Sequence, residues 1–291
     1  MIVFQSNTIF TTYDMEQKIA FNTKIELPSV RNIIVIASGK GGVGKSTIAA
    51  NLAIALSNTG VSTALVDADI YGPSIPLMFN VVNEKPLEQE INDKKVIMPV
   101  KRYGISLLSI GFFIDSEKAA VWRGPMASKV LIQLLEDTHW GEVDYMIIDL
   151  PPGTSDIQLT IAQKLQVTGA IIVTTPQNVA LASVKKAIEM FYQDKIKIPV
   201  KGIVENMSYF SSMEFHNKKY NIFGEGGGEK ISKEFNIPLL EKIPIDRKIC
   251  ESGDLGHSIA LKNEGVFSLL FNELAIKIIE QIKEVKYNIN P

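Results

Sequence analysis

A stretch rich in glycine and lysine has the residue types and spacing needed to hold phosphate. It matches the pattern G-x-x-x-x-G-K-[ST] and reads Gly39-Lys40-Gly41-Gly42-Val43-Gly44-Lys45-Ser46-Thr47. Glycines let successive backbone N–H groups face an anion, and a following helix adds the positive end of its dipole. We therefore expect residues 39–47 to bind ATP, with Lys45 on the β- and γ-phosphates and the Ser46 hydroxyl on Mg²⁺. The alternative is a glycine-rich turn without a ligand.

A second lysine, Lys40, lies inside the same loop. A cation there could neutralise charge on the transferring phosphate, as an arginine finger does in other enzymes. Because a lysine this early in the loop points away from its own γ-phosphate, we expect Lys40 to serve the nucleotide of a partner subunit. The loop therefore favours a homodimer. The alternative is a solvated loop charge.

Three aspartates stand at the ends of apolar runs, where ligand-binding groups collect in parallel sheets. Asp149 ends the run 145–149 in the Walker B pattern and would reach Mg²⁺ directly or through water. Asp67 and Asp69 follow the run 63–66. We expect Asp69 to orient the attacking water and Asp67 to contact water on Mg²⁺. Any one of these aspartates could instead be a turn or cap residue.

The elements that must position these groups alternate along the chain. A β-branched run at 33–37 precedes the loop, and apolar residues at helical spacing follow it. Further strand-like runs cover 63–66, 105–110, 145–149, 170–175, 200–204 and 239–243. This alternation predicts an α/β fold with a mainly parallel sheet and helices on both faces. With its loop, the fold is that of a P-loop NTPase of the deviant Walker A, or two-lysine, type.

The chain reads as one domain. No Pro/Ser-rich linker divides it, and helical patterns continue to a last helix with apolar residues from Phe267 to Val285. We predict an N-terminal extension at 1–30, a single P-loop ATPase domain at 31–285 and a tail at 286–291.

Composition excludes several classes of protein. Of 291 residues, 46% are hydrophobic, and the net charge of −2 gives no overall positive field for nucleic acid or an anionic membrane. The one cysteine, Cys250, excludes an intrachain disulfide framework and fits a reducing compartment. No targeting segment or apolar span of about 18 residues is evident. We expect a cytoplasmic protein with no nucleic-acid and no membrane partner.

Together with the loop, several further segments closely resemble the Mrp/ApbC family, which is related to MinD/ParA ATPases and the nitrogenase iron protein. These segments are Asp67-Ala68-Asp69-Ile70-Tyr71-Gly72-Pro73-Ser74, Trp122-Arg123-Gly124-Pro125-Met126, Asp149-Leu150-Pro151-Pro152-Gly153-Thr154 and Glu205-Asn206-Met207-Ser208. The likeness runs from about Leu27 to Ile259. It implies an ATP-hydrolysing iron–sulfur cluster carrier that acts as a homodimer on iron–sulfur apoproteins or assembly factors. It also implies that Lys40 acts in trans and that Asn206, with residues 244–246, lies near the adenine.

The sequence departs from this family at two places. Many members carry an additional N-terminal domain, which we expect to be absent because about 30 residues precede the core. The family also places a C-x-x-C pair after the Asn-Met-Ser segment, where two subunits bridge a cluster. The corresponding residues here are Ser212 and Phe215. Cys250 lies in a different segment, where a structural role is expected, and Ser212 or His216 would be harder ligands than thiolate.

Two alternatives to a cluster carrier remain. One is a MinD/ParA-like positioning ATPase, which would need a basic amphipathic helix or a basic surface. The other is a nucleotide-gated scaffold without a cluster of its own, which the missing cysteines favour.

One motif has no role in these hypotheses. Gly224 and Gly226-Gly227-Gly228 flank Glu225, and the segment is expected to be a flexible turn. Otherwise it is a loop that approaches a partner subunit or client protein.

Overall fold

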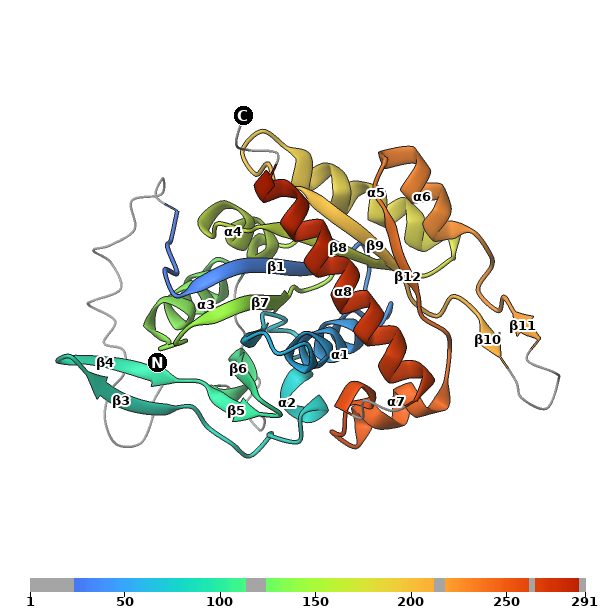
Figure 1. Ribbon diagram of the computed structural model, residues 1–291. Coiled ribbons are helices and arrows are strands. Elements are labelled where there is room, and N and C mark those ends of the chain that lie inside the picture. Colours follow the sequence, from blue (N-terminus) through green and yellow to red (C-terminus); the bar gives the residue numbers. More distant parts are fainter. Residues whose placement is uncertain (1–23, 114–123, 212–217, 262–264, 288–291) are drawn as a thin grey trace.

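The computed structural model describes residues 24–113, 124–211, 218–261 and 265–287 (Figure 1). The strands are β1 (Val30–Ser38), β2 (Thr63–Asp67), β3 (Leu87–Ile91), β4 (Lys94–Met98), β5 (Val100–Arg102), β6 (Ile105–Ser109), β7 (Val143–Asp149), β8 (Gly169–Thr174), β9 (Val200–Glu205), β10 (Phe210–Ser211), β11 (Lys219–Tyr220) and β12 (Leu239–Lys242). The α-helices are α1 (Lys45–Asn58), α2 (Ile75–Met78), α3 (Gly124–Asp137), α4 (Asp156–Lys164), α5 (Asn178–Tyr192), α6 (Gly227–Phe235), α7 (Arg247–Asp254) and α8 (Val266–Tyr287). Short 3-10 helices cover Ile110–Phe112 and Ile259–Leu261.

An eight-stranded sheet in the order β12-β9-β8-β1-β7-β2-β6-β5 forms the centre of the fold. Its strands are parallel except for β5, which runs antiparallel to β6. Asp67 and Asp149 are register partners on β2 and β7. The carboxyl ends of these strands therefore meet at one edge of the sheet, as the sequence pattern predicted.

Helices cover both faces of the sheet (Figure 1). One apolar cluster joins the sheet to α3, α4, α5 and α6, and a second joins its other face to α1, α2, α7 and α8. The middle strands are buried on both sides, which explains their continuous β-branched runs. The predicted fold class is confirmed.

Two antiparallel hairpins, β3–β4 and β10–β11, lie outside the main sheet. Strand β3 is exposed along most of its length, so its sequence lacks the apolar alternation that marks a half-buried strand. The sequence analysis did not predict either hairpin, nor the antiparallel β5.

Parts of the predicted extension and tail fall within the description. Ile25 bridges to Leu165, and β1 begins at Val30, so residues 24–30 lead directly into the sheet. Helix α8 continues to Tyr287. The rest of both segments, residues 1–23 and 288–291, lies outside the described residues, as do Trp122, Arg123, Ser212, Phe215 and His216.

Among the described helices, none combines the length and apolar character needed to cross a bilayer.

Candidate functional site

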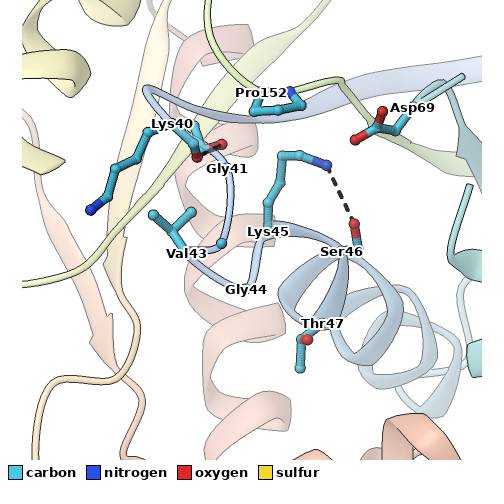
Figure 2. A pocket seen from close by; sticks show the side chains of 11 residues that line it. Lys40, Gly41, Val43, Gly44, Lys45, Ser46, Thr47, Asp69 and Pro152 are labelled. Carbon is cyan, nitrogen blue, oxygen red and sulfur yellow. Dashed lines mark hydrogen bonds between the residues drawn. The ribbon is translucent and has the colours of Figure 1, made fainter. Parts of the chain in front are cut away.

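The glycine-rich loop connects the end of β1 to the start of α1 and lines a cavity of about 220 Å³ (Figure 2). Gly42 and Gly44 adopt φ of 77° and 81°, a region that favours glycine. A Cβ on Gly39 would lie 2.3 Å from the backbone carbonyl carbon of Ser183, so this glycine permits close packing of the loop on α5. In the described chain no side chain caps the N-terminus of α1, which leaves its amide groups for an anion.

Lys45 and Ser46 both point to the carboxylate of Asp149. Lys45 Nζ donates to Asp149 Oδ1 at 2.6 Å, and Ser46 Oγ donates to Asp149 Oδ2 at 2.5 Å. The Lys45 and Asp149 side chains are 6% and 0% exposed. Burial raises the pKa of Asp149, and the neighbouring Lys45 and Ser46 oppose that rise. Lys45 is therefore paired with the carboxylate at the end of β7.

This donor set fits a magnesium ion. Mg²⁺ prefers hard oxygen ligands, and it usually retains several waters beside one or two protein groups. The Ser46 hydroxyl and the Asp149 carboxylate are in direct hydrogen-bond contact beside the loop. These two residues would hold the ion, which when bound would neutralise charge on the phosphate oxygens.

Asp67 is held by donors from its own surroundings. Its Oδ1 accepts from the Asp69 amide at 3.2 Å, while Oδ2 accepts from the Ile75 amide at 3.2 Å and from Ser109 Oγ at 3.0 Å. Burial raises the pKa of Asp67 to about 7, and the charge of Asp149 adds to the effect. Asp67 therefore ties β2 to the start of α2 beside the site.

Asp69 lines the cavity with Lys45 and Pro152, and Figure 2 shows it on the side toward which the Lys45 side chain points. Burial raises the pKa of Asp69, whereas the charge of Lys45 lowers it. A carboxylate with a raised pKa that lines such a cavity can accept a proton from, or orient, a water molecule.

Lys40 points away from Lys45 and Asp69 in Figure 2. Its Nζ donates to Gln177 Oε1 at 3.1 Å. Gln177 is the residue before the first turn of α5. The two lysines of one loop thus point in different directions, Lys45 to Asp149 and Lys40 to Gln177 at the start of α5.

Asn206 contacts the loop directly. Its Nδ2 donates to the Val43 carbonyl at 2.8 Å, and a Cβ on Gly44 would lie 2.1 Å from the same nitrogen. Ile245 donates its amide to the Tyr209 carbonyl at 2.7 Å, so residues 244–246 run beside the segment that follows Asn206. Residues 244–246 also line a second cavity of about 830 Å³ between α7 and the start of α8.

The sequence analysis gave no role to three residues of this region: Ser109, Gln177 and Glu205. Ser109 contacts Asp67, Gln177 contacts Lys40, and Glu205 accepts from Ser208. Only Glu205 had a local signal, because it immediately precedes Asn206.

The expectation of a flexible turn at the glycine-rich segment was wrong for its second half. Gly227 and Gly228 begin helix α6, and both are buried. A Cβ on Gly227 would lie 2.6 Å from the Pro176 carbonyl oxygen. These glycines therefore allow α6 to pack closely on its neighbours.

The described residues include one cysteine that could act as a thiolate ligand. Cys250 lies exposed on α7, with Sγ 3.8 Å from Asp254 Oδ2. Within the described ranges, no group of three or more His, Cys, Asp or Glu side chains is arranged to hold a metal ion.

Comparison with known proteins identifies relatives over most of the chain. A family model described as "ParA: NUBPL iron-transfer P-loop NTPase" matches residues 29–282. The "Iron-sulfur cluster carrier protein" of Aquifex aeolicus is 44% identical over 268 residues, covering 91% of this chain and 72% of that protein. The protein of the same name from Escherichia coli K12 is 45% identical over 255 residues, covering 87% and 67%. An Arabidopsis thaliana "Iron-sulfur protein required for NADH dehydrogenase, mitochondrial" is 39% identical over 268 residues, covering 91% and 83%.

Comparison with solved structures points to the same group of proteins. A nucleotide-binding protein from Archaeoglobus fulgidus, solved in complex with ADP, superposes with a TM-score of 0.70 at 36% identity, covering 84% of this chain and 93% of that one. The cell division ATPase MinD of Pyrococcus furiosus gives a TM-score of 0.63 at 23% identity over 86% and 98%, a likeness of fold alone. The resemblance to the Mrp/ApbC and MinD/ParA group is thus confirmed. The chain belongs to the ParA-type family of NUBPL iron-transfer P-loop NTPases.

Proposed function

We propose that this protein is an ATP-dependent carrier or assembly factor for iron–sulfur clusters. ATP with Mg²⁺ binds in the loop of residues 39–47 and is hydrolysed slowly by a homodimer. The observation that supports this best is the convergence of Lys45 and Ser46 on Asp149, which brings a buried cation, a hydroxyl and a carboxylate together beside the loop. The iron–sulfur role is supported by the family and by relatives that are named as cluster carriers.

In this proposal, each nucleotide lies between two subunits. Lys45 and the amides at the start of α1 bind the phosphates, and Asp69 positions the attacking water. Lys40 of each subunit leaves Gln177 and reaches the γ-phosphate of the other subunit, where it stabilises the developing negative charge. The outward direction of Lys40 supports this assignment.

The chain has a single cysteine with which to bind an iron–sulfur cluster. A four-iron cluster normally takes four thiolates, and a dimer of this chain supplies two, each on an exposed helix face. The residues present therefore do not fit a cluster bridged by paired cysteines. We propose that the protein acts as a nucleotide-gated partner of apoproteins or assembly factors, whose own thiolates complete the binding of the cluster.

Two linked measurements test this function. Reconstitution with iron and sulfide without oxygen should give no stable four-iron cluster on the purified protein. Transfer of a preformed cluster from a donor to an apoprotein that requires it should be faster with the wild-type protein and ATP than with Lys45→Ala and ATP. Four irons per dimer with thiolate-to-iron absorption would contradict the first statement. Equal transfer rates would contradict the second.

A positioning ATPase is the alternative that the same experiments leave open. Co-sedimentation of the ATP-loaded protein with anionic liposomes or DNA addresses it, and binding that weakens with salt would favour that class.

A further inference from the structure

We propose that Glu205 is a positioning residue for the nucleotide: it holds Asn206 against the phosphate-binding loop and links that contact to helix α6. The inference rests on the proposed binding of ATP at residues 39–47. It gives a role to a buried carboxyl group and to the glycine-rich segment.

Glu205 is the last residue of β9 and is 1% exposed. Both oxygens of its side chain are occupied. Oε1 accepts from Ser208 Oγ at 2.5 Å, and Oε2 accepts from the Gly228 amide at 2.5 Å. A buried carboxyl group is costly without such donors. Two different elements supply them to Glu205.

The first element is the turn that presents Asn206. Met207 adopts φ of 53°, which is unfavourable for a residue with a side chain. The turn is held by the Asn206 amide on the Thr174 carbonyl at 2.8 Å and by the Ser208 amide on the Ile243 carbonyl at 2.9 Å. The hydrogen bond from Ser208 Oγ to the Glu205 side chain links the two ends of the turn. This conformation directs the Asn206 carboxamide to the Val43 carbonyl.

The second element is the start of α6. A Cβ on Gly228 would lie 3.1 Å from Glu205 Oε2 and 2.8 Å from Leu239 Cδ1, so a side chain there would displace the helix. Gly227 packs equally closely on Pro176, the residue before Gln177. Glu205 therefore lies where the Asn206 turn, α6 and the entry to α5 meet.

From this arrangement, a change at Glu205 should reach the nucleotide through Asn206. Glu205→Gln keeps the volume of the side chain but replaces the carboxylate by a neutral amide. With the amide oxygen on the Gly228 N–H, the amide nitrogen faces Ser208 Oγ, and the hydrogen of the buried Ser208 hydroxyl loses its acceptor. The turn should relax toward a less strained conformation and withdraw Asn206 from Val43.

The test is a double-mutant cycle on ATP affinity, measured by titration calorimetry with Mg²⁺ on the full chain. We expect Glu205→Gln to weaken ATP binding about tenfold and Asn206→Ala to weaken it as well. In the Asn206→Ala background, Glu205→Gln should have little further effect, because both changes remove the same contact. Independent losses that multiply would overturn the proposal, since they would show that Glu205 does not act on ATP binding through Asn206.

Glu229→Gln is the matched control. Glu229 stands in the first turn of the same helix and pairs with Lys242 on β12, so its substitution tests the anchoring of α6 without removing either hydrogen bond of the Glu205 side chain. It should leave ATP affinity unchanged. Weakening equal to that of Glu205→Gln would overturn the proposal.

A second variant keeps the test decisive if Glu205→Gln does not fold. Ser208→Ala removes only the bond to Oε1 and should weaken ATP binding in the same direction, again without effect in the Asn206→Ala background. Failure of wild-type protein to bind ATP would refute the proposed function itself. Normal binding by the wild type, Glu205→Gln and Ser208→Ala alike would refute only the role of Glu205.

Discussion

Lys45 Nζ lies 2.6 Å from Oδ1 of Asp149, and this contact joins the glycine-rich loop of residues 39–47 to the end of strand β7. The two residues are 104 positions apart in the chain. Each is buried, and each supplies the other's counter-charge before a nucleotide arrives. Binding of a phosphate with Mg²⁺ would then exchange one pairing of charges for another beside the loop.

Breaking this pair should be costly in the nucleotide-free protein. Lys45→Met leaves the Asp149 carboxyl group buried without its cation, and we expect a loss of about 3 kcal/mol in the free energy of unfolding. Lys185→Met is the control, because the Lys185–Glu234 pair is exposed and should contribute at most about 1 kcal/mol. Urea denaturation of both variants checks this. Equal losses in the free energy of unfolding would show that the buried Lys45–Asp149 pair stabilises the protein no more than an exposed pair does.

Substitutions at Gly42 and Gly44 separate the cost of a positive φ from the cost of a steric clash. Both have positive φ, but only at Gly44 would a Cβ meet a neighbour, the Asn206 carboxamide. Gly42→Ala should cost about 1 kcal/mol in stability through φ alone, and Gly44→Ala should cost more. Adding Asn206→Gly to Gly44→Ala should recover part of the difference. Thermal unfolding without nucleotide measures these effects, and equal costs at both glycines would contradict the close contact.

Lys40 should matter for turnover and little for binding. Its side chain points away from Lys45 and Asp69 and donates to Gln177, so Lys40→Ala should leave ATP affinity near that of the wild type. Turnover should fall about 10³-fold, the scale of removing an arginine finger.

Mixed dimers decide whether Lys40 acts across the subunit interface. When Lys40→Ala subunits are mixed with Asp69→Ala subunits, a trans lysine restores one intact site in each mixed dimer. Activity above that of either parent would support this geometry. No recovery would mean that Lys40 acts within its own subunit or not at all.

The raised pKa of Asp67 predicts how stability depends on pH. In the fold its pKa is about 7, against about 3.9 in an unfolded chain. Between these values the folded protein keeps a proton that the unfolded chain has lost, so stability should fall as pH rises through this interval. Unfolding midpoints at pH 5 and pH 8, with a chelator and without nucleotide, measure the slope. Asp67→Asn should flatten it, and an unchanged slope would contradict the assignment.

The predictable part of this protein is its local chemistry. Residues 39–47 share one strand–loop–helix unit, so their type and spacing alone indicate a phosphate site. The buried strands can be predicted because both of their faces are covered, which gives continuous apolar runs in the sequence. The sheet order places Asp67 and Asp149 side by side, as their positions at strand ends suggested.

The contacts that tune the site could not be predicted in this way. Gln177 meets Lys40 from 137 positions away, and Glu205 meets Gly228 from 23 positions away. Neither contact leaves a periodic trace, because a single polar side chain at a helix entry or strand end has many possible partners. The exposed hairpins were missed for a related reason, since strand β3 does not bury one face.

Titration of ATP with Mg²⁺ into the folded protein, followed by calorimetry, tests the central claim most directly. We expect saturable uptake of one ATP per chain by the wild type and a large loss of affinity in Lys45→Ala. A well-folded wild-type protein that takes up no ATP would contradict the assignment of the loop, and with it the nucleotide-dependent carrier that we propose.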